Sequence, residues 1–218
     1  MRGSANFVNL LQWVPFALAC AGVKLRLKKT ERKSMYREKI ITELIKDKDV
    51  LDIGSLGQSN EYCLWNLIAD HCKTLTGVDL PESFQTAKKL FSIKNESLSH
   101  KEDSRIVYGN METINLKKKF DIVVAGDILE HVSNQGLFLD NIHRHLRDSG
   151  KLILTTPNAK WPTVFLKPNI THTLWHDRYT LATLMHRHKF NISSLQYYYG
   201  NKIYYSWWKK MLLARQSI

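Results

Sequence analysis

The chain has 218 residues, 44% of them apolar and 24% charged, which suits one globular domain and excludes a disordered or collagen-like chain. A chain of this length buries roughly 70% of the surface of its unfolded state, so its core needs no disulfide or metal. The three cysteines form no C-x-x-C pair, and this favours a reducing, cytoplasmic compartment. The net charge of +12 favours anionic partners, such as nucleic acid, an acidic lipid surface or a phosphorylated substrate.

An apolar stretch at residues 7–23 runs directly into a basic segment at residues 24–39, which carries half of the net charge. We interpret residues 1–33 as an N-terminal extension whose apolar part forms a helix. That helix either lies peripherally on an anionic membrane at its inner face or packs on its own domain. The stretch is too short and too polar for a typical transmembrane helix, and a cleaved signal peptide is the alternative.

From residue 34 on, short β-branched apolar runs alternate with longer amphipathic ones, the pattern of βαβ units around a parallel sheet. We expect strands at residues 50–53, 74–79, 105–108, 120–125, 151–155 and 191–199. We expect helices at residues 35–46, 61–72, 84–91, 135–147 and 180–189. Residues 34–201 are therefore expected to form one domain, and residues 202–218 a basic, aromatic tail.

The strongest local signal is VLDIGSLGQSN at residues 50–60, where an apolar strand runs into a glycine turn and then a helix. Gly54 and Gly57 let the backbone turn tightly and approach a ligand, while the next helix offers N–H groups to an anion. Asp79 ends the following strand, where an acidic residue can accept the two hydroxyls of a ribose. Together these features favour a nucleoside ligand over an ordinary βα turn.

In chain order, these motifs resemble those of the class I S-adenosylmethionine-dependent methyltransferases, in the type 11 and 23 branch that includes ubiquinone-type enzymes. The resemblance covers residues 49–201 and is carried by VLDIG, GVDL, YGNMETIN, FDIVVAGDILEHVSN and HRHLRDSGKLILTTPNA. It implies an α/β fold with a Rossmann-like, doubly wound sheet of seven mostly parallel strands, the last one antiparallel. It also implies S-adenosylmethionine as the cofactor.

The resemblance implies that Asp52, Gly54 and Gly57 hold the methionine end of the cofactor, and that Asp79 holds the ribose. The loop departs from the family pattern, because Leu56 stands where the second of three glycines is usual.

For the adenine ring, the resemblance implies that Leu80 covers one face and that Asn110 and Met111 contact its edge and ring. Asn110 replaces the usual acidic residue. An amide can still contact the adenine amino group through its carbonyl oxygen.

Asp127, Glu130 and His131 follow the fourth expected strand, whose carboxyl end faces the ligand crevice of such a sheet. Asp127 is assigned to the cofactor, and His131 and Glu130 to catalysis. Methyl transfer requires positioning of the acceptor and, for a hydroxyl, a base near neutral pH, a role that suits His131. A structural role for these residues is the alternative. A magnesium site formed with His172 or His176 is a further alternative, but we expect no metal.

The acceptor is expected to be an oxygen or nitrogen atom of a small molecule, lipid-linked or glycan precursor handled at a membrane surface. Trp161, Trp175 and the histidines from His172 onward are expected on the acceptor side of the site. Aromatic residues at 197–208 beside two lysines are typical of a membrane interface or of RNA stacking. An RNA methyltransferase and a non-catalytic scaffold that binds the cofactor remain alternatives, and the oligomeric state is left open.

Overall fold

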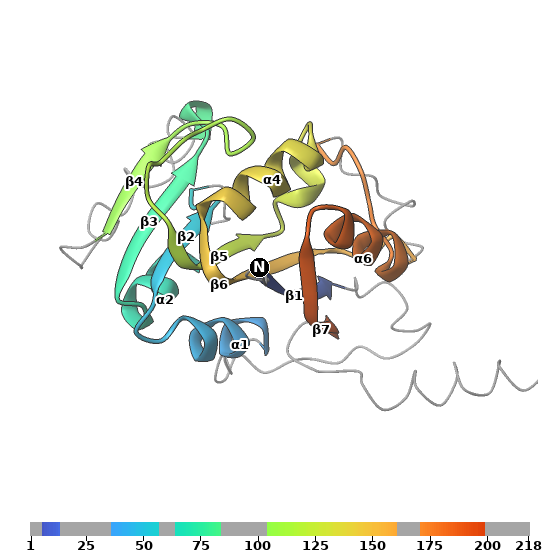
Figure 1. The fold of residues 1–218 in the computed structure, drawn as a ribbon, viewed down its shortest axis with the longest axis horizontal. Helices are drawn as coiled ribbons and strands as arrows, with labels where there is room; N and C mark the ends of the chain where they lie inside the picture. Colours follow the sequence, from blue (N-terminus) through green and yellow to red (C-terminus); the bar gives the residue numbers. More distant parts are fainter. Residues whose placement is uncertain (1–5, 14–35, 57–63, 84–103, 161–170, 199–218) are drawn as a thin grey trace, which may run out of the picture.

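One seven-stranded sheet runs through the protein (Figure 1). The computed structural model describes residues 6–13, 36–56, 64–83, 104–160 and 171–198. The strands are β1 (Asn6–Trp13), β2 (Asp49–Ile53), β3 (Thr74–Asp79), β4 (Ser104–Tyr108), β5 (Phe120–Gly126), β6 (Leu146–Pro157) and β7 (Phe190–Tyr198). Their order across the sheet is β4-β3-β2-β5-β6-β1-β7, and every pairing between neighbours is parallel.

Helices cover both faces of the sheet, as expected for a doubly wound fold (Figure 1). The helices are α1 (Tyr36–Ile45), α2 (Leu64–His71), α4 (Gln135–His145) and α6 (Arg178–Arg187), with a short 3-10 helix η1 (Leu129–His131) after β5. Side chains of α1 and α2 pack on one face, around Val50 and Val124. Those of α4 and α6 pack on the other face, around Leu51 and Val123. Adjacent strand residues therefore serve different cores, which is why these strands are apolar throughout.

The prediction of an N-terminal helix is wrong for residues 6–13. Asn6–Trp13 instead forms strand β1, which lies between β6 and β7. Val8 and Leu10 are fully buried in the sheet core. A short apolar run fits a buried strand as well as a helix, and its partners are far away in sequence. Residues 6–13 thus belong to the sheet and not to a separate extension, while residues 14–35 lie outside the described part.

The expected antiparallel last strand is also wrong, since β7 runs parallel to its neighbour β1. Strand β1 occupies the position between β6 and β7 and runs parallel to β6, so β7 pairs with β1 and not with β6. A sequence pattern gives the existence of a strand but not its direction, which depends on how the chain returns to the sheet.

The helices α4 and α6 each begin at a capping residue that the local sequence supplies. Asn134 caps α4 by accepting a hydrogen bond from the Leu137 N–H at 3.0 Å. Asp177 caps α6 in a capping box with Thr180. These caps fix where the two helices begin, and therefore how the loops before them reach the carboxyl edge of the sheet.

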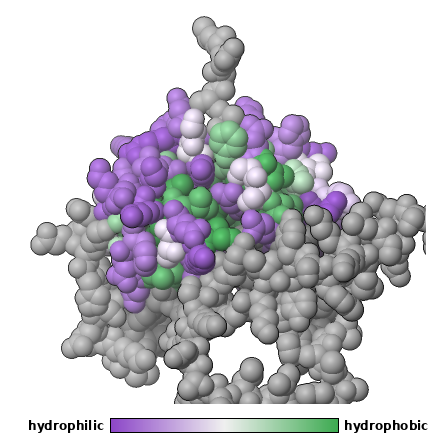
Figure 2. All heavy atoms as spheres, turned by 90° about the horizontal axis from the view of Figure 1, so that it is seen from below, coloured by the Kyte–Doolittle hydropathy of each residue, from purple (hydrophilic) through white to green (hydrophobic). Residues whose placement is uncertain are grey.

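Two expected elements, the helix at residues 84–91 and the tail at 202–218, lie outside the described residues. Within the described ranges, no helix has the length and hydropathy needed to cross a membrane. In the part of the molecule that is coloured in the view from below, hydrophilic residues surround hydrophobic ones near the centre (Figure 2).

Candidate functional site

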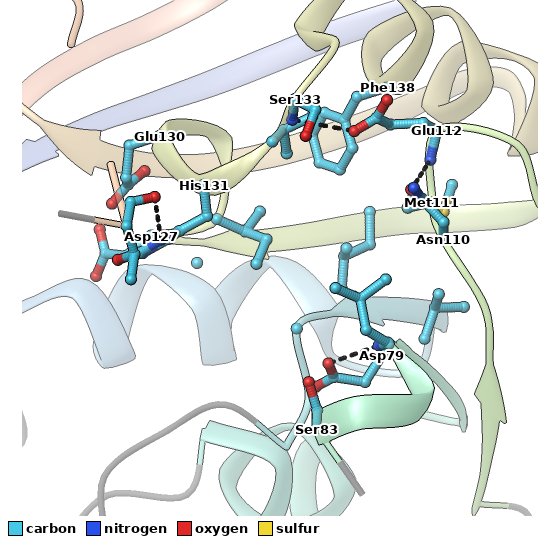
Figure 3. A pocket seen from close by; sticks show the side chains of 18 of the residues that line it. Asp79, Ser83, Asn110, Met111, Glu112, Asp127, Glu130, His131, Ser133 and Phe138 are labelled. Atoms are coloured by element: carbon cyan, nitrogen blue, oxygen red, sulfur yellow. Dashed lines mark hydrogen bonds between the residues drawn. The ribbon is translucent and has the colours of Figure 1, made fainter. Parts of the chain in front are cut away.

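The carboxyl ends of β2, β3, β4 and β5 meet at one edge of the sheet and surround a pocket of about 840 Å³. This is the edge at which open α/β sheets bind their ligands. Figure 3 shows Asp79 and Ser83 at one end of the pocket, and Asp127, Glu130 and His131 at another. The pocket therefore joins the predicted cofactor and catalytic residues in one space.

Gly54 forms the turn after β2 and lines the pocket. Its φ of +78° lies in the left-handed region, and an added Cβ would stand 3.0 Å from the Ile128 Cδ1 atom. Both features require glycine and let the backbone reach the pocket. Gly57 lies outside the described residues, so its predicted contact stays a prediction.

Asp79 is buried at the end of β3, and its carboxylate accepts two backbone hydrogen bonds. The Leu56 N–H donates at 2.6 Å and the Leu80 N–H at 2.8 Å. The first bond ties the glycine turn to the end of β3. A carboxylate offers about four acceptor positions, so capacity remains for two hydroxyls of a ligand in the pocket.

The residues predicted to surround adenine line another side of the pocket. Leu80 is 46% exposed, so an aromatic ring can cover it. Met111 is nearly buried and joins the pocket to the core. The Asn110 Oδ1 accepts a hydrogen bond from the Glu112 N–H at 2.8 Å. One lone pair of this oxygen is used inside the turn, and one remains for a ligand amino group.

Asp52 does not line the pocket, unlike the other described residues that were predicted to bind the cofactor. It is buried at the end of β2, and this burial raises the pKa of its carboxyl to about 7. The Asp79 carboxylate raises it further. A direct contact between Asp52 and the cofactor stays a prediction.

Asp127 follows β5 with a φ of 52°, and both of its carboxylate oxygens are engaged. Its Oδ2 atom lies 2.7 Å from the Arg37 Nη1 atom, and its Oδ1 accepts a hydrogen bond from the Thr155 hydroxyl at 2.9 Å. Arg37 comes from α1 and also lines the pocket. A guanidinium can bind the carboxylate of an amino acid group, and a neighbouring carboxylate can bind its ammonium.

Sequence reasoning missed Arg37, which it counted among the basic residues 24–39. Its side chain is only 12% exposed. No motif marks it, because its partner Asp127 is 90 residues away in sequence.

Glu130 is 2% exposed, and its carboxylate accepts a hydrogen bond from the Thr156 hydroxyl at 3.1 Å. Burial, and secondarily the nearby Asp127 carboxylate, raises the pKa of Glu130 to about 8. Glu130 therefore keeps its proton at neutral pH, which makes it a poor general base there.

His131 lines the pocket and is exposed to it. Its Nδ1 atom lies 3.2 Å from the Thr171 carbonyl oxygen. Because a carbonyl only accepts, Nδ1 carries the proton, and the lone pair of the neutral ring is on Nε2. His131 is thus held in the tautomer of a base.

His172 packs edge-on against the His131 ring, with centroids 4.6 Å apart. Its Nδ1 accepts the indole N–H of Trp175 at 3.1 Å. Burial and the neighbouring His131 lower the pKa of His172. His172 lines the pocket, and Trp175 contacts His172 from outside the pocket lining. Their role on the acceptor side stays a prediction, and Trp161 is outside the described residues.

A metal alternative can be tested against the donor atoms. Glu130, His131 and His172 bring one oxygen and two ring nitrogens within 4.8 Å of one another. His176 instead bonds to Gln135 through Nε2 at 2.8 Å. Magnesium prefers oxygen ligands, so this nitrogen-rich set does not fit the magnesium alternative.

In comparisons with known proteins, the chain is similar to methyltransferases. A family model described as a methyltransferase domain matches residues 26–196. A ubiquinone biosynthesis O-methyltransferase of Bradyrhizobium diazoefficiens is 32% identical over 90 residues, which cover 41% of this chain and 34% of that protein. One of Nitrobacter winogradskyi is 34% identical over 56 residues, covering 26% and 22%. The chain thus matches about a third or less of the length of these relatives.

Solved structures share the fold. The YcgJ protein of Bacillus subtilis has a TM-score of 0.54 at 16% identity, with 70% of this chain and 67% of that chain covered. Magnesium protoporphyrin IX methyltransferase of Synechocystis, solved with bound S-adenosylhomocysteine, has a TM-score of 0.50 at 14% identity, with 70% of each chain covered.

Proposed function

Since the chain belongs to the family of S-adenosylmethionine-dependent methyltransferase domains, we propose that it methylates a hydroxyl oxygen of a small-molecule acceptor, with His131 as the general base. When bound, the cofactor would supply a methyl group on a sulfonium, so that an oxygen–carbon bond could form as the carbon–sulfur bond breaks and a thioether leaves. The curated relatives are named ubiquinone biosynthesis O-methyltransferases, which supports an oxygen atom as the acceptor, and we take phenolic hydroxyls as the acceptor class to test.

In this proposal, the residues at the carboxyl edge hold and orient the reactants. The free acceptor positions of the Asp79 carboxylate bind ribose hydroxyls, and Leu80 covers a face of adenine. Arg37 and Asp127 face the amino acid group, with the guanidinium toward a carboxylate and the carboxylate toward an ammonium. Such positioning is the main contribution that a methyltransferase can make to an in-line displacement.

The contact between the His131 Nδ1 atom and the Thr171 carbonyl oxygen is the observation that carries the proposal. Its Nδ1–H donates to the Thr171 carbonyl, so Nε2 is the ring atom that can accept the proton of the attacking hydroxyl. Glu130, with a pKa of about 8, stays protonated beside it at neutral pH. Glu130 is therefore not available as a base at neutral pH, and the Nε2 atom of His131 is the acceptor that the geometry offers.

The test is production of S-adenosylhomocysteine from S-adenosylmethionine by the purified chain. A panel of phenols and catechols, a lipid extract and an RNA preparation would serve as acceptors in separate reactions. We expect turnover with a phenolic compound. Turnover with RNA alone, with binding that weakens steeply as salt rises, would replace the proposal by the RNA alternative. Cofactor binding without turnover on any acceptor would favour the scaffold alternative.

A further inference from the structure

We propose that strand β1 is part of the catalytic scaffold, because its buried Gln12 fixes the segment at residues 171–176 and thereby the orientation of His131. Gln12 lies outside the residues that the family model matches, which begin at residue 26. In this proposal Gln12 is a positioning residue that acts through the backbone of His176. The activity consequence rests on the proposed role of His131, but the geometry below does not.

A run of buried and partly buried hydrogen bonds leads from β1 to the helical turn that carries the proposed catalytic residues. The fully buried Gln12 donates from Nε2 to the His176 carbonyl at 3.0 Å. The His176 ring donates from Nε2 to the Gln135 Oε1 at 2.8 Å, and Gln135 donates from Nε2 to the Leu129 carbonyl at 2.9 Å. Since Leu129 begins η1, this run connects β1 with the helical turn that ends at His131.

The segment at residues 171–176 is also bonded directly to η1 and to the residue that follows it. Thr173 donates to the Glu130 carbonyl from its N–H at 2.7 Å and from its hydroxyl at 3.0 Å, and the hydroxyl also lies 3.0 Å from the Val132 carbonyl. The Thr171 carbonyl then receives the Nδ1–H of His131. A shift of residues 171–176 would therefore move the acceptor that holds the His131 tautomer.

The cost of the buried amide supports a positioning role. In the described part of the chain, the Gln12 Oε1 atom is buried with no hydrogen-bond partner. An unpaired buried carbonyl costs free energy that an apolar residue of similar size would avoid. A residue that is costly for stability but well placed for a site is what a functional constraint produces.

The same strand offers a matched control. Asn9 is another buried amide of β1, and its Oδ1 accepts hydrogen bonds from the hydroxyls of Ser193 and Ser194 at 2.7 and 2.9 Å. These bonds tie β1 to β7 and lead away from the pocket. Asn9→Leu therefore removes buried polar contacts of β1 without touching residues 171–176, whereas Gln12→Leu removes the contact with His176.

The experiment compares hydrogen exchange and histidine NMR in the full-length wild type, Gln12→Leu and Asn9→Leu. The Ala159 N–H donates to the same His176 carbonyl at 2.9 Å, so its exchange reports on this segment. In Gln12→Leu, the amides of Thr173 and Ala159 should exchange about fivefold faster, the effect of losing one buried hydrogen bond. Long-range proton–nitrogen spectra should show His131 protonated on Nδ1 in the wild type and in Asn9→Leu. In Gln12→Leu they should show a mixture of tautomers.

Equal exchange and an unchanged His131 tautomer in both variants would overturn the proposal, as would identical changes in both. If Gln12→Leu does not fold, Gln12→Asn replaces it under the same criteria, because its shorter amide cannot span the distance to the His176 carbonyl. None of these measurements uses an acceptor. They can therefore succeed even if His131 proves not to be a base, and they can fail even if it is one.

Discussion

His131 accepts the reacting proton in the proposed function, so its removal should affect turnover far more than binding. We expect His131→Ala to lower turnover by about 10²-fold, a typical contribution of general base catalysis, with nearly unchanged affinity for S-adenosylhomocysteine. Turnover is measured by product formation and affinity by calorimetry. His186→Ala, which alters an exposed histidine of α6, is the control. Loss of cofactor affinity and thermal stability together would instead assign His131 a structural role.

Asp79 combines two functions that the sequence alone did not separate. Its carboxylate is assigned to the ribose, and it also holds the Leu56 N–H of the glycine turn. We expect Asp79→Ala to weaken binding of S-adenosylhomocysteine at least about tenfold, because charge-assisted hydrogen bonds are lost on both sides. Calorimetry measures this, with the exposed Asp70→Ala as the control. A folded Asp79 variant of unchanged affinity would remove this residue from the site.

Glu130 predicts how stability depends on pH. Its pKa is about 8 in the folded state and about 4.5 when exposed, so the folded state binds this proton more tightly. The free energy of unfolding contributed by Glu130 therefore falls as pH rises from about 4.5 to about 8. Glu130→Gln should lose less stability between pH 5 and about pH 8.5 than the wild type, measured by urea unfolding. The exposed Glu43→Gln should follow the wild type, and a parallel fall in all three would contradict the assignment.

Strand β1 makes residues 6–13 part of the central sheet and not of a separate extension. It pairs with both β6 and β7, so its loss would break the sheet between them. We expect deletion of residues 1–13 to give an unfolded or insoluble protein, whereas deletion of residues 1–4 leaves the strand complete. Circular dichroism and thermal unfolding of the two truncated chains provide the measurement. A folded 14–218 chain with a cooperative transition would show that β1 is dispensable.

The first turn of α1 contributes a residue to the pocket that the sequence placed in the basic segment. Arg37 belongs to the basic run in sequence, but in the fold it reaches the pocket and pairs with Asp127. The charge of this run therefore does not serve a single purpose. Part of it belongs to the site.

At the scale of the whole molecule, the net charge of +12 supports the proposal that the protein binds an anionic membrane surface. The test can no longer be removal of residues 1–33, because this would also remove β1. Replacement of Lys24, Arg26, Lys28 and Lys29 by glutamine neutralises charge without altering any described strand. We expect the wild type to float with vesicles of acidic lipid at low salt, and the variant to float less. Absence of wild-type flotation would end the peripheral-membrane proposal.

The sequence alone determined the parts of the fold that depend on local pattern. The glycine turn, the acidic end of β3 and the segment from Asp127 to His131 each follow a strand, and parallel strands bring their carboxyl ends to one edge. This is why Gly54, Asp79, Asp127, Glu130 and His131, which were predicted from their positions after strands, line one pocket. Leu80, Asn110 and Met111, which the family resemblance implied, line it as well. The strand and helix positions from residue 36 to residue 198 were mostly predicted to within a few residues for the same reason.

Tertiary structure decided what depends on contacts distant in sequence. A short apolar run became β1 because the space between β6 and β7 buries Val8, Leu10 and Gln12, and its neighbours fixed a parallel direction. Arg37 entered the site because α1 packs beneath the sheet with its first turn near Asp127. The tautomer of His131 depends on a carbonyl 40 residues away. Such features arise when separate segments exclude water together, and no local pattern encodes which segments will meet.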